Sequence, residues 1–348
     1  MATLKEIAEY TGYSPAAISR ILSGDQTLSV TEEARRAVLE AAGKLNYNET
    51  RSRRGRNPKT VLRIGLADML TPAQQLDDPY YLYLSNYVKQ GCIEKKYALT
   101  PLERRNDLFV APHGEPLNGI IAVGLFTPKQ IESLAAITPN VVFLDSSPME
   151  SRFDSVVLGY ELGISLAMEH LIQLKHHKIG FVGPTYKYPD RRQNALEIRR
   201  QVYCALMEKY GLQDNEVFVE CIMELEPTIQ AWKEFFQSGQ ELPTAVICAN
   251  EDNAIGTVQS LMQKGYSVPQ DISVVSFNDT PRSALLTPSL TSVSVNEEEM
   301  ANTALRLVYE RAVLPGKTPI RTIPLKVVVP PTLVVRESSS ALDVSPEN

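Results

Sequence analysis

Three polar side chains follow closely on apolar runs of strand length, and they are the clearest candidates for binding chemistry. They are Asp145 after residues 141–144, Asn250 after residues 245–248 and Asn278 after residues 274–277. Carboxylates and amides carry two polar atoms side by side, which suits them to forked hydrogen bonds with adjacent hydroxyl groups of a ligand. Asp145 and Asn250 could instead cap helices that begin after the strands. Both alternatives stay open on the sequence alone.

The sequence contains none of the short motifs that would indicate catalysis or a bound metal. It has no G-x-x-x-x-G-K-[ST] phosphate loop, G-x-G-x-x-G fingerprint or G-x-S-x-G elbow. Its four cysteines form no C-x-x-C pair, and its four histidines form no H-E-x-x-H motif. The adjacent carboxylates of Asp77 and Asp78 precede a proline and suit a turn or hydroxyl binding better than acid–base catalysis. We therefore expect no enzyme activity, no catalytic residue, no metal and no cofactor.

The residues from 14 to 20 have a pattern suited to reading the edges of DNA bases. Small side chains at Ala16 and Ala17 permit close approach to a thymine methyl group, and Arg20 can donate two hydrogen bonds to a guanine. Ser19, Tyr47 and a helix N-terminus suit phosphate contacts. The residues expected to contact DNA in this region are Thr3, Ser14, Pro15, Ala16, Ala17, Ser19, Arg20 and Tyr47. A three-helix packing module without a DNA partner is the alternative.

Three short helices are predicted to position these residues. Apolar residues follow helical spacing from residue 4, after a Thr3 cap that Glu6 completes as a capping box. Gly12 tolerates the positive φ of a tight turn, and Ser14–Pro15 then starts a second helix that runs to residue 22. A third helix is expected from Thr31. Two helices joined by a short glycine turn are typical of a helix-turn-helix.

Charge is distributed unevenly along the chain. Residues 1–59 hold ten Lys or Arg and seven Asp or Glu, a balance of +3 that leaves −9 on the remainder of a chain with net charge −6. Five of the nine residues in 51–59 are cationic. A basic head on an acidic body indicates that only the head touches a polyanion, although a solvated linker without a partner is the alternative. The sequence contains no membrane-spanning run and no secretory signal, so we expect a cytoplasmic protein.

Beyond residue 60, apolar runs of strand length alternate with longer amphipathic stretches. The runs lie at 62–66, 119–123, 141–144, 178–182, 245–248 and 272–277. Continuous apolar strands separated by helices are typical of parallel sheets covered on both faces, so the predicted fold class is α/β behind an all-α head. About 275 residues exceed one comfortable sheet, and two lobes are expected. Polar residues at the strand ends would then line a cleft.

The head closely resembles that of the lactose-repressor/galactose-repressor family. The matching stretches are Thr3–Ala8, Gly12–Leu22 and Leu45–Tyr47, three linked motifs in the family's order. The resemblance implies that the second helix enters the major groove, and that a following hinge helix inserts a leucine pair into the minor groove. Residues 51–58 contain no leucine, and Gly55 and Pro58 oppose a helix. We therefore predict that Arg51, Arg53 and Arg54 enter the minor groove instead.

The body resembles the family's sugar-sensing domain, which is itself similar to periplasmic sugar-binding proteins. The resemblance covers residues 61–336 and includes Phe143–Asp145, Ile179–Pro184, Ala249–Gly256 and Thr287–Thr291. It divides the chain into a helix-turn-helix domain at 1–48, a basic hinge at 49–60, a two-lobed effector-binding and dimerisation domain at 61–336 and a disordered tail at 337–348. Lobe 1 is expected at about 61–157 and 294–317, and lobe 2 at about 158–293 and 318–336.

The resemblance also implies an effector site in the cleft. Arg199 matches a family arginine, and Asp78 and Tyr81 lie where the galactoside-responsive branch has the same Asp-Pro-Tyr-Tyr. The implied effector-binding residues are Asp78, Tyr81, Asp145, Arg199, Asn250 and Asn278. Arg199 as a surface ion-pair member, Tyr81 as a core aromatic and Asp78 as a turn residue are the alternatives. Asn278 replaces an aspartate of many members, and the aromatic platform for a sugar is expected from Tyr81, Tyr186 or Phe277.

These observations predict a sequence-specific transcription repressor that binds a pseudo-palindromic, double-stranded operator as a homodimer. A sugar of the galactoside type is expected to release it from the operator. A regulator of the same fold that has lost its ligand response, or that uses the sugar as co-repressor, is the alternative. A transport-type binding protein is disfavoured by the fused head. The polar sequence from 336 to 344 lacks heptads, so we expect a dimer and not a tetramer.

Overall fold

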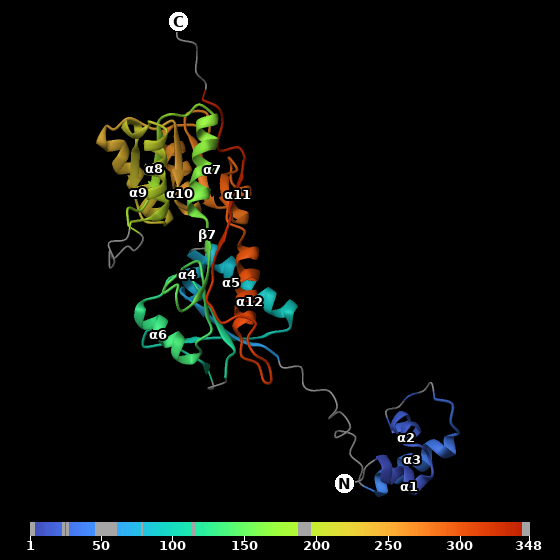
Figure 1. The fold of residues 1–348 in the computed structure, drawn as a ribbon. Helices are drawn as coiled ribbons and strands as arrows, with labels where there is room; N and C mark the ends of the chain where they lie inside the picture. Colours follow the sequence, from blue (N-terminus) through green and yellow to red (C-terminus); the bar gives the residue numbers. More distant parts are fainter. Residues whose placement is uncertain are drawn as a thin grey trace. The chain divides into compact units, whose positions relative to one another are not determined.

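The computed structural model describes residues 4–22, 25, 28–45, 61–77, 79–112, 116–186 and 196–342. The chain divides into two units, residues 1–60 and residues 61–348 (Figure 1). Six of the candidate DNA- or effector-binding residues lie outside the described residues: Thr3, Tyr47, Arg51, Arg53, Arg54 and Asp78. Their proposed contacts therefore stay predictions from the sequence.

The first unit contains the three expected helices. They are α1 (Leu4–Thr11), α2 (Pro15–Leu22) and α3 (Glu32–Lys44). Their apolar faces meet in a small core that includes Ile7, Ile18 and Val38. Gly12 has φ +73° in the turn between α1 and α2, a conformation that glycine adopts without steric cost. Thr31 caps α3 by accepting a hydrogen bond from the Ala34 N–H.

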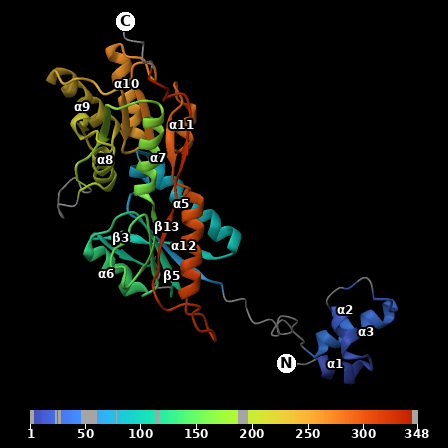
Figure 2. The same cartoon turned by 45° about the horizontal axis from the view of Figure 1, so that its top comes forward.

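Lobe 1 of the second unit is built on a six-stranded parallel sheet. Its strand order is β13-β7-β6-β5-β1-β2. The strands are β1 (Arg63–Asp68), β2 (Ala98–Pro101), β5 (Gly119–Val123), β6 (Val141–Leu144), β7 (Asp154–Leu158) and β13 (Lys326–Val329). Helices α5 (Pro79–Lys95) and α12 (Glu297–Arg311) lie on the opposite side from α6 (Pro128–Ile137) (Figure 2). The short helix α4 (Pro72–Asp77) contacts α5. A hairpin of β3 (Glu103–Arg105) and β4 (Leu108–Val110) completes the lobe.

Lobe 2 repeats this arrangement. Its sheet has the order β14-β12-β11-β10-β8-β9, in which β14 alone is antiparallel to its neighbour. The strands are β8 (Ile179–Gly183), β9 (Val217–Glu220), β10 (Ala245–Cys248), β11 (Ser273–Asn278), β12 (Thr291–Ser294) and β14 (Thr332–Val334). The helices are α7 (Tyr160–Gln173), α8 (Ile198–Lys209), α9 (Leu225–Ser238), α10 (Glu251–Lys264) and α11 (Pro281–Leu285), with a 3-10 turn η3 (Gln213–Asn215). The inner strands of both sheets, such as β5, β6, β8 and β10, are buried on both faces, because helices cover both sides. The edge strands β2, β13 and β14 are partly exposed.

The chain crosses between the lobes three times, and the third crossing differs from the sequence-based prediction. The first two lie between β7 and α7 and between β12 and α12. The third lies between Val329 and Thr332, not near residue 317, because β13 pairs with β7 at the edge of the lobe 1 sheet. Arg321 helps to hold this segment on lobe 1 by an ion pair with the buried Asp154 (2.8 Å). Residues 318–329 therefore belong to lobe 1.

The prediction of a disordered tail from residue 337 is wrong for residues 337–342, which pack on lobe 2. Ser338 is fully buried, and its hydroxyl donates to the Val274 carbonyl (2.6 Å) and accepts from the Thr291 N–H (2.8 Å). His176 lies within 3.0 Å of the Ser340 carbonyl oxygen. Short hydroxyl side chains can satisfy backbone groups beside a sheet, so a serine-rich sequence need not be disordered. Residues 343–348 lie outside the described residues.

Candidate functional site

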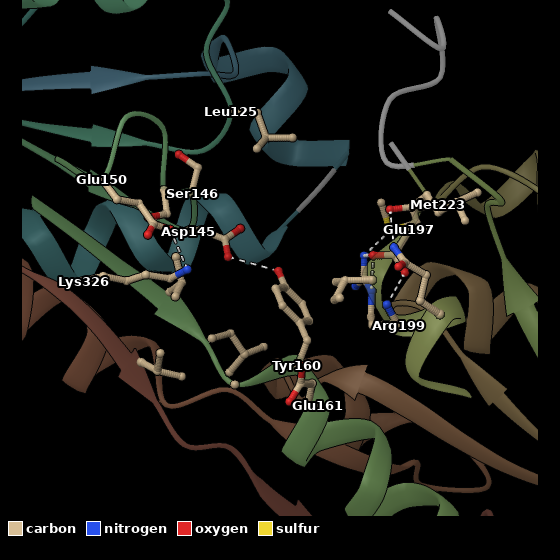
Figure 3. A pocket seen from close by; sticks show the side chains of 18 of the residues that line it. Leu125, Asp145, Ser146, Glu150, Tyr160, Glu161, Glu197, Arg199, Met223 and Lys326 are labelled. Atoms are coloured by element: carbon tan, nitrogen blue, oxygen red, sulfur yellow. Dashed lines mark hydrogen bonds and ion pairs between the residues drawn. The ribbon is translucent and has the colours of Figure 1, made fainter. Parts of the chain in front are cut away.

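A pocket of about 610 Å³ lies between the two lobes (Figure 3). Lobe 1 contributes Tyr81, Leu125, Asp145, Glu150 and Lys326 to its lining, and lobe 2 contributes Tyr160, Glu197, Arg199 and Met223. Three residues proposed from the sequence, Tyr81, Asp145 and Arg199, therefore come together in one pocket. The crossing after β7 forms part of the wall, so the pocket lies directly beside one of the segments that join the two lobes.

Asp145 is the acceptor at the centre of this pocket. Its carboxylate accepts hydrogen bonds from the Tyr81 hydroxyl of lobe 1 (3.0 Å) and from the Tyr160 hydroxyl of lobe 2 (3.2 Å). Asp145 has φ +69°, an uncommon conformation for a non-glycine residue and one that concentrates at functional sites. No helix begins after it, so the helix-cap alternative is wrong. A ligand with hydroxyl groups could replace the two tyrosine hydroxyls on this carboxylate.

Tyr160 is a pocket residue that the sequence reasoning missed. It is the first residue of α7, directly after the chain crosses from lobe 1. Its ring stacks on the buried Phe277 at a centroid distance of 6.0 Å, and burial, followed by the charge of Asp145, raises its pKa well above the ordinary tyrosine value. Tyr160 closely follows the end of a predicted crossing strand, and this position could have indicated a pocket residue. Of the three aromatic residues expected to form a platform for a sugar, only the half-buried Tyr81 lines the pocket. Tyr186 does not line it, and the buried Phe277 packs against Tyr160.

Arg199 is buried and held by an ion pair and hydrogen bonds, so it is not a member of a surface ion pair. It is only 7% exposed and pairs with Glu197, which is 3% exposed, at 2.9 Å. Its Nη1 donates to the Ala249 carbonyl (2.5 Å), and its guanidinium lies 5.3 Å from the ring centroid of Tyr160. Burial opposes its charge, but Glu197, Tyr160 and Asp145 together outweigh this effect and raise the pKa of Arg199. Arg199 is therefore a fixed cation at one end of the pocket.

The two asparagines proposed from the sequence do not line this pocket. Asn250 caps α10, because its side-chain oxygen accepts from the Asn253 N–H (2.9 Å). Its amide nitrogen also donates to the carbonyl of Met223 (3.1 Å), and Met223 does line the pocket. Asn278 ends β11 with φ +92°. The helix-cap alternative thus holds for Asn250, and direct effector contacts by either asparagine stay predictions.

The face of α2 that was predicted to read DNA is exposed. Ala16, Ser19 and Arg20 are exposed, while Ile18 and Ile21 are buried against the other two helices. The Ser14 hydroxyl accepts a hydrogen bond from the Ala17 N–H (3.3 Å) and so caps the helix. Arg20 pairs with Asp25 at 2.7 Å. The helix presents small side chains and one arginine on a single outward face, as a recognition helix requires.

Two kinds of feature are absent from the described part of the chain. No group of three His, Cys, Asp or Glu side chains among them is placed to hold a metal ion. None of the helices in this part of the chain combines the length and apolar character that crossing a membrane requires.

A helix-turn-helix head followed by a two-lobed body of parallel sheets defines a class of two-domain transcriptional regulators. Residues 168–339 match the family model of a periplasmic binding protein-like domain. Over 313 residues the chain is 31% identical to the HTH-type transcriptional regulator GanR of Bacillus subtilis (strain 168), covering 89% of this chain and 93% of GanR. It is 29% identical over 349 residues to the transcriptional repressor MelR of the same organism, covering 97% of each chain. The chain belongs to the lactose-repressor/galactose-repressor family of DNA-binding transcriptional regulators, which are not enzymes.

Solved structures show the same fold. The lac repressor dimer bound to operator and the anti-inducer ONPF superposes with a TM-score of 0.61 at 23% identity, covering 98% of this chain and 99% of that one. The complex of the transcriptional regulator CelR with cellobiose gives a TM-score of 0.64 at 20% identity, covering 97% of this chain and 100% of that one. Both likenesses extend over nearly the whole chain, so the order of head and lobes is shared.

Proposed function

We propose that this regulator is a homodimeric repressor that binds its operator through α2 and is released when a sugar occupies the interlobe pocket. The observation that carries the proposal is the convergence of Tyr81, Asp145 and Arg199 on one pocket. Each was singled out from the sequence as an effector-binding residue, although they come from three different elements of the two lobes. Asp78, Asn250 and Asn278 complete the proposed set of effector-binding residues.

The chemistry of the pocket supports a sugar ligand. Asp145 offers a charged acceptor, Arg199 offers charged donors, and the rings of Tyr81 and Tyr160 offer apolar surface beside them. A pyranose needs this combination, because its hydroxyl groups pair with forked polar side chains while its ring packs on aromatic faces. CelR, which has the same fold, forms a complex with cellobiose, and this supports a carbohydrate ligand here.

The position of the pocket supports a switch. A ligand redistributes two conformations only by binding one of them more tightly. Both lobes contribute side chains to the wall, and Asp145 of lobe 1 already accepts a hydrogen bond from Tyr160 of lobe 2. A sugar that replaces this interlobe contact changes the balance between lobe orientations. In a dimer, that change alters the spacing of two heads on a pseudo-palindromic operator.

A galactoside is the sugar class that we propose. The sequence Asp78-Pro79-Tyr80-Tyr81 supports this class, because it resembles the galactoside-responsive branch of the family, such as the evolved β-galactosidase repressor. In the DNA-binding head, Thr3, Ser14, Pro15, Ala16, Ala17, Ser19, Arg20 and Tyr47 are proposed to contact DNA. In the basic hinge at residues 49–60, Arg51, Arg53 and Arg54 are proposed to enter the minor groove.

The test begins with selection of bound DNA from a random pool, which identifies the operator. Release is then measured by fluorescence anisotropy of that DNA against a panel of galactosides, glucosides and pentoses, with light scattering to establish the dimer. A galactoside that releases operator DNA but leaves binding to random DNA unchanged supports the proposal. A sugar that strengthens operator binding would make it a co-repressor. Lack of any response across the panel would favour a regulator without a sugar effector.

A further inference from the structure

The interlobe pocket extends beyond the space between Asp145 and Arg199. In Figure 3, Glu197 and Arg199 lie at one end and Glu150 and Lys326 at the other, with Asp145 between them. The volume of about 610 Å³ lies well within the range of roughly 300–1,000 Å³ that holds ligands of drug size. A single sugar ring bound between Asp145 and Arg199 therefore leaves the far end of the pocket vacant.

The far end carries a polar pair that contributes little to stability. Lys326 Nζ pairs with Glu150 Oε1 at 2.8 Å, and the side chains are 43% and 56% exposed. The Ser147 hydroxyl also donates to Glu150 Oε1 (3.2 Å). Lys326, followed by Ser147, lowers the pKa of Glu150, so this carboxylate is charged near neutral pH. Exposed ion pairs of this kind exchange readily for other hydrogen-bonding partners, which suits them to bind a ligand.

An apolar floor lies beside this polar pair. Val328 is half-exposed and follows Lys326 by two residues on β13, so the two side chains lie on the same face of the sheet. Val157 of β7 lies opposite Val328 in the register of the parallel pair, and both valines line the pocket. A donor, an acceptor and an apolar surface are therefore grouped together a second time, as at the Asp145 end.

We propose that Glu150 and Lys326, with Val157 and Val328 beneath them, bind a second sugar ring, so that the effector is a disaccharide or a longer oligosaccharide. This inference rests on the proposed sugar-binding function. The first ring occupies the pocket between Asp145 and Arg199. Lys326 donates to hydroxyl oxygens of the second ring, Glu150 accepts from its hydroxyl groups, and its apolar face packs on the two valines.

The experiment compares methyl β-galactoside with galactosyl disaccharides of several linkages, using calorimetry on the full-length protein. At least one disaccharide is expected to bind about tenfold more tightly than the methyl glycoside, the gain expected from hydrogen bonds to charged groups. Lys326→Met and Glu150→Gln should each remove most of this gain and leave methyl glycoside affinity within about twofold. Lys233→Met, exposed on α9 outside this pocket, is the matched control and should change neither affinity.

Three outcomes overturn the inference, and they separate it from the proposed function. If the methyl glycoside binds and no disaccharide binds more tightly, the second-ring site is wrong and the sugar function stands. If Lys326→Met weakens both ligands equally, the residue contacts the first ring or acts on folding, and the second-ring assignment fails. If neither ligand binds but another class of molecule does, both proposals fall.

Discussion

Arg199→Ala removes a cation that the folded body holds between Glu197, the Ala249 carbonyl and the rings of Tyr160 and Phe277. After this loss, the carboxylate of Glu197 still accepts hydrogen bonds from the backbone N–H groups of residues 199 and 200. The Glu197 side chain is 4% exposed, so solvent does not replace the missing charge. The substitution therefore tests both the stability of lobe 2 and the effector site.

The expected magnitude follows from the burial of the pair. Breaking a buried ion pair by removing one partner typically costs about 3–5 kcal/mol, because the remaining charge stays desolvated. Arg199→Ala should lower the free energy of unfolding by that amount. The double variant Glu197→Gln/Arg199→Ala should recover a substantial part of it, since the glutamine oxygen still accepts the two backbone hydrogen bonds without carrying a charge. Glu197→Gln alone should cost less than Arg199→Ala, because Arg199 keeps the Ala249 carbonyl and the rings of Tyr160 and Phe277 as partners.

Urea denaturation followed by tryptophan fluorescence measures these changes. Trp232 is the single tryptophan of the chain and is fully buried in lobe 2, so its emission reports unfolding of that lobe. Below the onset of unfolding, Arg199→Ala should abolish the response to sugar and leave operator affinity within a few-fold. A loss below about 1 kcal/mol, or a double variant as unstable as the single one, would refute the buried-pair reasoning. A retained sugar response at unchanged concentration would exclude Arg199 from the effector site.

Three further predictions concern the head, the interlobe pocket and the pH dependence of stability. Arg20→Ala should weaken operator binding by roughly 1–3 kcal/mol in a DNA titration, and an equal loss on random DNA would make Arg20 a phosphate contact only. Tyr160→Phe removes an interlobe hydrogen bond to Asp145, so the galactoside concentration that gives half-release of operator DNA should fall about two- to tenfold. An unchanged concentration would contradict the idea that the sugar and Tyr160 compete for Asp145. Burial raises the pKa of Glu297 from 4.5 to about 7, so the folded body binds a proton that the unfolded chain releases, and stability falls as pH rises between these values. In urea denaturation at a series of pH values, Glu297→Gln should reduce the decrease of the midpoint with rising pH. Glu298→Gln, at an exposed neighbouring position, should leave that decrease unchanged.

Local patterns in the sequence were sufficient to predict the elements. The head follows from helical spacing and a glycine turn, and its three helices appear where the spacing placed them. The body follows from continuous apolar runs, because a strand buried on both faces of a parallel sheet has no polar side. Asp145 was found for the same reason, since the end of a strand is visible in the sequence and the ends of parallel strands meet at one edge.

Long-range pairing was decided only by the tertiary structure. Residues 326–329 have the character of a strand, but their pairing with β7 rather than with the lobe 2 sheet depends on partners more than 150 residues away. Whether Arg199 is buried or exposed depends on Glu197, Ala249 and Phe277 meeting around it. Tyr160, Glu150 and Lys326 are ordinary residues in the sequence and become pocket residues only when two lobes approach. Periodicity and composition are local properties, whereas the convergence of side chains is set by contacts between distant segments.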